Sequence, residues 1–86
     1  MLNKKNFEKF MILISIIGNF AFYVQAFKTY YYKDASSLSF LSYLISFVTI
    51  TLWLSYGIYI KNTPLIVGNI LGFIGSLIIL IGILIF

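Results

Sequence analysis

The stretch KDASSLSFLSYLISFVTITLWLSYGIYIKNTP, residues 33–64, decides the fold, because two short polar segments enclose a long run without charge. Residues 35–60 carry no charged side chain, whereas the segments 33–37 and 61–64 hold charged and turn-forming residues. A helix needs roughly 20 apolar residues to cross about 30 Å of hydrocarbon. The stretch therefore predicts one membrane-spanning helix at about 38–60, with a short connection at each end.

The same pattern continues on both sides of this stretch. Residues 10–27 and 62–86 are also uncharged. We expect two more spanning helices, at about 9–32 and 64–86, with Lys28 near the end of the first. A lysine in that position extends its ammonium group to the membrane interface. The chain is thus predicted to be an all-α membrane protein of three transmembrane helices.

The two connections contain residues that favour helix starts. Ser36 or Ser37 is expected to cap the second helix, and Thr63 to cap the third, with Pro64 at its first position. Connections this short make neighbouring helices antiparallel. The N-terminus and the second connection should therefore share one side of the membrane, and the first connection and the C-terminus the other.

Composition supports a membrane protein and excludes other classes. Of 86 residues, 62% are hydrophobic and 9% are charged, against roughly 25% charged in a soluble domain. The mean hydropathy is +1.05. A soluble domain of this size cannot bury so much apolar surface. We expect a single domain over residues 1–86 in the inner (plasma) membrane, in contact with the lipid bilayer and with no nucleic-acid partner.

The chain contains no cysteine, so it has no thiolate metal ligand or cysteine nucleophile. It also contains no histidine, which is the commonest general base and metal ligand. We expect no enzymatic activity, no metal and no cofactor. A cleavable signal peptide is the alternative for the N-terminal helix, with Lys4 and Lys5 as its basic region. The long apolar run and the missing cleavage pattern disfavour it.

Polar residues recur along one face of the second expected helix. Alternating spacings of three and four residues place six side chains there: Ser39, Ser42, Ser46, Thr49, Trp53 and Tyr56. Hydroxyls without partners are costly in lipid, so this polar stripe should face protein or water. Helix-to-helix bonding explains any single hydroxyl. A stripe along a whole helix favours the lining of a cavity.

The other helices carry small residues and amides. Gly68, Gly72 and Ser76 form a series typical of close helix packing. Asn69 lies in the third helix and needs polar partners, either on a neighbouring helix or on a bound polar solute. Its sequence position leaves both possibilities open.

Amides of the first helix raise the same question, at Asn19 and Gln25. Gln25 shares a face with Gly18 and Ala21, which predicts a close helix contact there. No Asp, Glu, Arg or His lies within the membrane interior, and proton relays and sodium sites usually need carboxylates. The pattern therefore favours a passive facilitator of a neutral solute, such as a polyol or sugar.

Three helices cannot enclose such a solute, whereas two copies of the chain can. With the polar stripes facing each other across a two-fold axis, two Trp53 and two Asn69 side chains would surround one cavity.

Four fragments, in this order and spacing, carry a resemblance to a known family: Phe22-x-Val24-Gln25-x-x-Lys28, Ser39-x-x-x-Tyr43, Trp53-x-x-Tyr56-Gly57 and Pro64-x-x-x-x-Asn69. They resemble the SemiSWEETs, the bacterial half-size relatives of the SWEET sugar facilitators, within the PQ-loop group. The resemblance covers about residues 18–72.

The resemblance implies a three-helix bundle with the third helix between the other two. It also implies a parallel homodimer around one central pathway, which moves mono- or disaccharides, glucose- or sucrose-like, by alternating access. The family's substrate residues fall on Trp53 and Asn69, and a gate tyrosine falls on Tyr56. From the polar stripe, Ser42, Ser46 and Thr49 are expected to line the cavity.

The chain departs from the family in two places. Val24 stands where the family has the proline of its hinge, and only Gln25 of the pair remains. Ile60 and Asn62 stand near positions where some members have a charged pair, so an ionic latch is not implied.

Two matters stay open in the sequence. The resemblance implies an N-terminus outside the cytoplasm, whereas the distribution of lysines favours a cytoplasmic one. The alternative function is a non-transporting membrane assembly subunit or a holin-like pore former, which does not predict the polar stripe.

Overall fold

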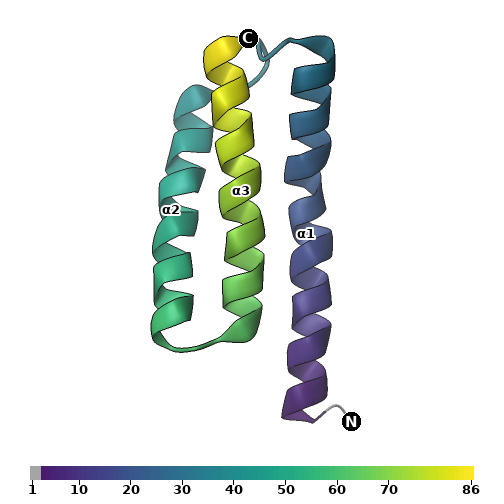
Figure 1. Cartoon of the computed structure of the whole chain (residues 1–86), viewed down its shortest axis with the longest axis vertical. Coiled ribbons are helices and arrows are strands. Elements are labelled where there is room, and N and C mark those ends of the chain that lie inside the picture. The colour runs from purple at the N-terminus through teal and green to yellow at the C-terminus, as the bar shows by residue number, and fades with distance from the viewer. Residues whose placement is uncertain (1–2) are drawn as a thin grey trace.

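The computed structural model describes residues 3–86 and consists of three long helices (Figure 1). They are α1 (Lys4–Tyr32), α2 (Phe40–Tyr59) and α3 (Thr63–Ile85). Each is long and apolar enough to cross a membrane. The described residues contain no strand. The expected all-α architecture with three spanning helices is confirmed.

The first helix starts five residues before the predicted boundary at residue 9. Asn3 caps it, because its side chain accepts a hydrogen bond from the Asn6 N–H at 2.8 Å. The early turn contains Lys and Glu, which are good helix formers. A charged residue marks where a helix leaves the membrane, but it does not mark where the helix begins.

The caps of the other helices also differ from the prediction. Ser39, and neither Ser36 nor Ser37, caps α2, since its hydroxyl accepts from the Ser42 N–H at 3.1 Å. Asn62 caps α3 through the Leu65 N–H at 3.1 Å, so Thr63 is already helical. These corrections shift each start by one or two residues and leave the three-helix order unchanged.

Ser36 cannot cap α2 because the connector between α1 and α2 uses it for its own turn. The Ser36 N–H donates to the Asp34 carboxylate at 2.9 Å, and the Leu38 N–H donates to the Ala35 carbonyl at 3.0 Å. The backbone and side-chain hydrogen bonds from Ser36 lower the pKa of Asp34. The connector is therefore an ordered polar turn, with its two serines before the helix start.

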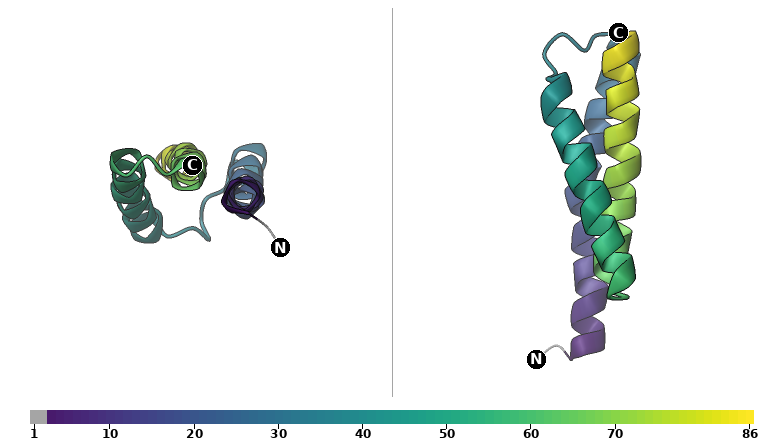
Figure 2. Two further views of the ribbon diagram at one scale, coloured as in Figure 1. Left: turned by 90° about the horizontal axis from the view of Figure 1, so that it is seen from below. Right: turned by 90° about the vertical axis from the view of Figure 1, so that its left-hand side faces the viewer.

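The third helix lies between the other two. Seen along the helices, the molecule is a shallow arc with α3 at its middle (Figure 2). Within the described chain α3 packs on both neighbours, whereas α1 and α2 make no close backbone approach to each other. The N-terminus and the α2–α3 turn share one end of the bundle, and the α1–α2 connector and the C-terminus share the other (Figure 1). The expected antiparallel order is confirmed.

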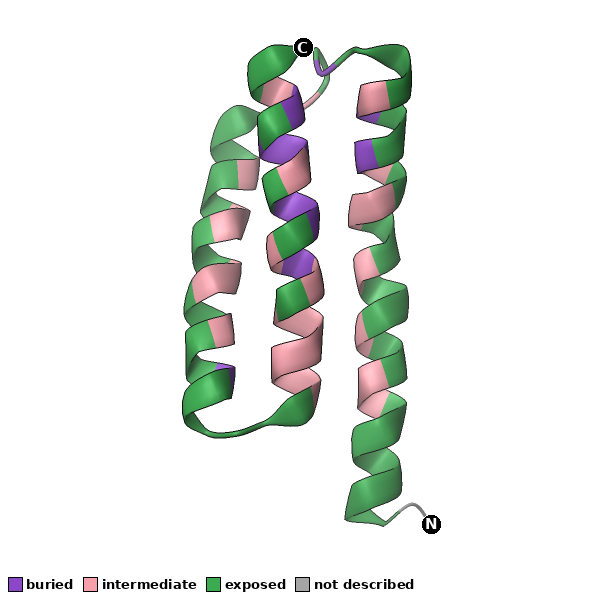
Figure 3. Cartoon of the chain, in the orientation of Figure 1, coloured by how far each residue is buried: buried purple, intermediate pink, exposed green. Residues whose placement is uncertain are grey.

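The core lies where α3 meets α1. Ser76 and Ile79 of α3 are 0% exposed, and the purple segments of Figure 3 gather on the same helix. Tyr23 and Tyr30 of α1 donate from their hydroxyls to the carbonyls of Leu71 and Ile78, each at 2.7 Å. The α1–α3 contact is therefore both packed and hydrogen-bonded.

Small residues allow this close approach, as the sequence predicts. A Cβ on Gly68 would lie 3.0 Å from the Ser15 hydroxyl oxygen, and one on Gly75 would lie 2.8 Å from the Phe22 Cβ. The second helix is held differently, by apolar contacts such as the Phe47 and Phe73 rings, whose centroids are 4.8 Å apart. Its one buried residue in this structure is Gly57.

Candidate functional site

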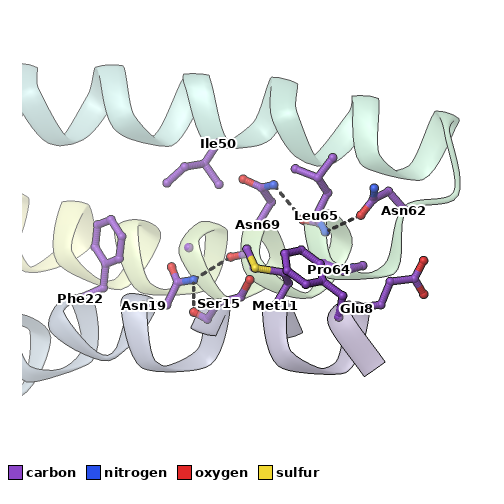
Figure 4. Close-up of a pocket in the computed structure, with 13 residues that line it drawn as sticks. Glu8, Met11, Ser15, Asn19, Phe22, Ile50, Asn62, Pro64, Leu65 and Asn69 are labelled. Atoms are coloured by element: carbon purple, nitrogen blue, oxygen red, sulfur yellow. Dashed lines mark hydrogen bonds between the residues drawn. The ribbon is translucent and has the colours of Figure 1, made fainter. Parts of the chain in front are cut away.

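A pocket of about 580 Å³ opens between α1 and α2, with α3 as its floor (Figure 4). It lies toward the end of the bundle that holds the N-terminus and the α2–α3 turn. Its lining comes from all three helices and from the α2–α3 turn: Phe7, Glu8, Met11, Ser15, Asn19, Phe22, Ile50, Asn62, Pro64, Leu65, Gly68, Asn69 and Gly72. We call this pocket the groove. It exists because α1 and α2 stay apart on one side of α3.

Two of the three asparagines that line the groove lie within the helices, Asn19 on α1 and Asn69 on α3. Asn69 of α3 donates from Nδ2 to the Leu65 carbonyl at 2.8 Å, one turn earlier. Asn19 of α1 donates from Nδ2 to the Ser15 carbonyl at 2.8 Å and to the Gly68 carbonyl at 3.0 Å. Asn19 therefore joins α1 to α3, whereas Asn69 bonds only within its own helix. Apart from Glu8 at the mouth, every polar side chain of the groove is a neutral hydroxyl or amide.

Trp53 and Tyr56 lie on the adjacent face of α2, outside the groove. With Thr49 and Leu52 they line a shallow pocket of about 390 Å³. Their rings meet edge to face, with centroids 5.9 Å apart, and each side chain is 51% exposed. One protomer thus does not bring Asn69 and Trp53 into one pocket, because Asn69 lines the groove and Trp53 the smaller pocket on α2.

The hydroxyls of the polar stripe differ from their neighbours on α2. Thr51 and Ser55, which lie off the stripe, donate to carbonyls one turn earlier, at 2.8 and 3.0 Å. Within residues 3–86, the side chains of Ser42, Ser46 and Thr49 form no hydrogen bond; Ser42 and Thr49 are exposed, and the Ser46 oxygen is not buried. These three hydroxyls are therefore open to a partner from outside the protomer.

The first helix passes through the expected hinge region without a break. Val24 is exposed and lies within one continuous helix from Lys4 to Tyr32. Gln25 donates from Nε2 to the Thr29 hydroxyl oxygen at 3.1 Å, and that hydroxyl donates to the Gln25 carbonyl at 2.9 Å. The hinge-region amide is thus bonded within its own helix.

The predicted close helix contact around Gln25 is wrong within the protomer. A Cβ on Gly18 would meet nothing within 4 Å. Gly18, Ala21 and Gln25 instead line a third pocket of about 270 Å³, together with Phe22 and Tyr43. This face points into the space between α1 and α2, which α3 does not fill.

Sequence reasoning passed over most lining residues of α1, among them Ser15 and Phe22. Phe22 borders both the groove and the third pocket. The signal was present, because Ser15, Asn19 and Phe22 share one helical face and Gly68 and Gly72 of α3 have a matching four-residue spacing. No cluster of metal-ligating side chains occurs in the part of the chain that the structure describes.

Comparison with known proteins identifies the family. Residues 9–86 match the model of the family described as sugar efflux transporter for intercellular exchange. A protein of Vibrio sp. (strain N418), named sugar transporter SemiSWEET, is 34% identical over 82 residues, which cover 93% of this chain and 84% of the relative. No solved structure gives a significant match.

These matches confirm the resemblance to the SemiSWEETs. Together with three helices long enough to span a bilayer, they make the chain a multi-pass protein of the plasma membrane. The family consists of transporters, which fits the expectation that the chain is not an enzyme. The chain therefore belongs to the family of sugar efflux transporters for intercellular exchange.

Proposed function

We propose that the protein is a passive facilitator that moves mono- or disaccharides across the membrane by alternating access, as a parallel homodimer. The observation that carries this proposal is the set of open polar groups on one side of the bundle. The groove holds three amides, and the hydroxyls of Ser42, Ser46 and Thr49 have no hydrogen-bond partner within residues 3–86. Such groups are costly against lipid, so a second protomer and a polar solute are their natural partners.

A two-fold axis completes the site. Place the axis parallel to the helices and in front of the groove. Rotation by half a turn then sets α1 of one protomer opposite α2 of its partner, with equivalent ends level. Two grooves and two polar stripes then enclose one central cavity. The lining of that cavity would include Ser42, Ser46 and Thr49 from each copy.

The substrate contacts follow from the side chains that face this cavity. Trp53 is half exposed, and its ring can stack on the apolar face of a sugar. Asn69 has one amide hydrogen and its oxygen free for sugar hydroxyls, because one hydrogen is bonded to Leu65. Each protomer supplies one of each, so the sugar lies between two Trp53 rings.

The opening and closing of the cavity involve both ends of the bundle. Tyr56 lies one turn from the end of α2, so it is proposed as a gate residue on the side of the N-terminus. With Val24 in place of a proline, α1 keeps its full hydrogen-bond ladder. We therefore infer that whole protomers rock about the axis, with the Val24–Gln25 region moving as part of a straight helix.

Transport into liposomes tests this function. Purified protein takes up radiolabelled glucose and sucrose, with no ion gradient imposed and with unlabelled sugar inside for counterflow. We expect saturable uptake in the wild type, and its loss in Trp53→Ala and in Asn69→Ala. Ser55→Ala is the matched control, since its hydroxyl lies off the stripe and bonds to Thr51.

Each other outcome has a definite meaning. Uptake without saturation, together with leakage of small dyes, would indicate the pore former. No uptake of any sugar by a folded dimer would overturn the proposal in favour of a non-transporting subunit. Unchanged uptake in both variants would keep the transporter and reject the assigned substrate residues.

A further inference from the structure

The amide of Asn19 presents only an oxygen to the groove. An asparagine amide has two hydrogens and one carbonyl oxygen. Both hydrogens of Asn19 have partners, the carbonyls of Ser15 and Gly68 at 2.8 and 3.0 Å. Because carbonyl oxygens only accept, the nitrogen must face them. The opposite side of the amide, Oδ1, is thereby fixed toward the pocket (Figure 4).

This oxygen has no donor and remains accessible. No hydrogen bond to Asn19 Oδ1 occurs within residues 3–86, and no side-chain oxygen or nitrogen there is both buried and without a partner. Asn19 itself lines the groove. A polar oxygen that is held in place, unpartnered and accessible is ready to accept a hydrogen bond from a solute.

The glycines of α3 leave room for this arrangement. A Cβ on Gly72 would lie 3.1 Å from Asn19 Oδ1 and 3.2 Å from the Ile50 Cδ1. A Cβ on Gly68 would crowd Ser15 in the same way. The two glycines therefore do more than allow the helices to approach, because they also leave open the floor on which the Asn19 oxygen lies.

We infer that Asn19 is a substrate-specificity residue, whose Oδ1 accepts a hydrogen bond from one hydroxyl of the transported sugar. This inference rests on the proposed function. It differs from the role proposed for Asn69, which keeps one free amide hydrogen and can therefore donate as well as accept. A solute at the Asn19 position must bring a donor, as a hydroxyl group does.

Sugar analogues that separate donors from acceptors test the inference. A deoxy sugar loses the hydroxyl, whereas a deoxyfluoro sugar replaces it with fluorine, which cannot donate. The measurement is inhibition of labelled-sugar uptake in liposomes by the full set of monodeoxy and monodeoxyfluoro forms of the transported sugar. We expect one ring position at which both analogues bind about five-fold more weakly than the parent, the effect of one neutral hydrogen bond.

The variant Asn19→Ala should remove that discrimination. Its uptake of the parent sugar should weaken by a similar factor, through KM, while the deoxy and deoxyfluoro forms at the sensitive position should now bind as well as the parent. A merely structural role of Asn19 would weaken all analogues equally. If Asn19→Ala fails to fold, Asn19→Ser serves the same purpose, because a helical serine bonds to its own backbone and does not reach the pocket. Ser55→Ala should keep the wild-type profile.

The results separate this inference from the proposed function. Saturable sugar uptake with an analogue profile that does not depend on Asn19 would overturn the inference and leave the facilitator standing. Tolerance of fluorine in place of hydroxyl at every position of the sugar, in the wild type, would overturn the inference in the same way. Absence of all sugar uptake in a folded dimer would overturn the facilitator, and the assignment of Asn19 with it.

Discussion

At the scale of single residues, the hydrogen-bond partner of each polar atom in the membrane interior decides whether the residue holds helices together or stays available to a solute. Tyr23 and Tyr30 are both half-buried, and both donate to carbonyls of α3 that already accept within their helix. Trp53 and Tyr56, by contrast, remain half exposed. The same aromatic chemistry thus serves assembly on α1 and is left free on α2. This division separates residues that hold the bundle together from residues available to a solute.

Removing one hydroxyl on α1 should measure the strength of its contact to α3. We expect Tyr23→Phe to lower the free energy of unfolding by about 0.5–1.5 kcal/mol, because the 2.7 Å bond to the Leu71 carbonyl is lost. Tyr59→Phe is the control, since that side chain is 84% exposed. Thermal unfolding in detergent, followed by circular dichroism, gives the comparison. Equal stability of the two variants would contradict the assigned role of Tyr23.

A methyl group should have opposite effects at two glycines. At Gly75 it would lie 2.8 Å from the Phe22 Cβ, which cannot move without shifting α1, so we expect Gly75→Ala to destabilise by about 1–3 kcal/mol. At Gly18 it would meet nothing within 4 Å, and the higher helix propensity of alanine should leave stability unchanged or raised. The melting temperatures of the two variants decide the matter. A destabilised Gly18→Ala would point to a close partner on that face.

At the scale of helices, α1 and α3 form one unit and α2 is attached to it more loosely. Side-chain hydrogen bonds join α1 to α3 at three places, through Asn19, Tyr23 and Tyr30. No side-chain hydrogen bond joins α2 to α3 among the described residues. Apolar contact alone lets a helix slide or tilt at low cost. The helix that carries Trp53 is therefore the one best able to move.

The start of α2 offers a direct test of its local structure. Ser39→Ala should destabilise the protein by about 1 kcal/mol, because the capping bond to the Ser42 N–H is lost. Ser37→Ala should be close to neutral, since Ser37 lies in the connector before the helix. Chemical or thermal unfolding of both variants provides the measurement. A larger loss of stability in Ser37→Ala than in Ser39→Ala would show that Ser37 caps the helix, as expected from the sequence.

How much of each helix could be predicted from the sequence depends on which force sets the feature. The spans follow from burial of apolar residues in lipid, and all three were predicted. The caps follow from local competition for backbone N–H groups. The Ser36 N–H donates to the Asp34 carboxylate, so Ser36 belongs to the connector turn, and residue spacing does not reveal this bond.

The site divides in the same way. The stripe on α2 and the position of Asn69 follow from helical periodicity. That the face of Gly18 and Gln25 borders open space, and that Asn19 bonds to Gly68, depend on which helix lies in the middle. The resemblance implied that order, whereas periodicity alone does not, and the bonds that follow from it were not foreseen.

At the scale of the whole molecule, the arc of three helices leaves one face incomplete. The groove is open between α1 and α2, and the side chains of Ser42, Ser46 and Thr49 form no hydrogen bond within residues 3–86. A second copy is the simplest complement, because a two-fold rotation brings a polar face onto a polar face. The proposed parallel dimer requires equivalent ends of the two protomers to lie at the same level, which can be tested without a transport measurement.

Cysteine cross-linking tests the parallel arrangement. Because the chain has no cysteine of its own, only the introduced cysteines can react. In the parallel dimer, Glu8 at the groove mouth lies level with Lys61 of the partner subunit. Differently tagged copies of Glu8→Cys and Lys61→Cys, mixed in one membrane, should give a mixed-size product with a short thiol-reactive linker. Glu8→Cys with Lys33→Cys is the control, because those positions lie at opposite ends. Cross-linking only in the control pair would establish an antiparallel dimer instead.

The end of the bundle that carries the N-terminus has a further consequence, for charged solutes. Lys4, Lys5 and Lys9 at the start of α1 and Lys61 in the α2–α3 turn lie at this end with Glu8, so this end of the bundle carries a net positive charge. Inside the groove no cationic side chain replaces the hydration of an anion. A sugar phosphate should therefore be enriched at this surface and yet be refused passage. In the proposed facilitator, phosphorylating a sugar after entry would therefore trap it inside, because only the neutral form could pass back.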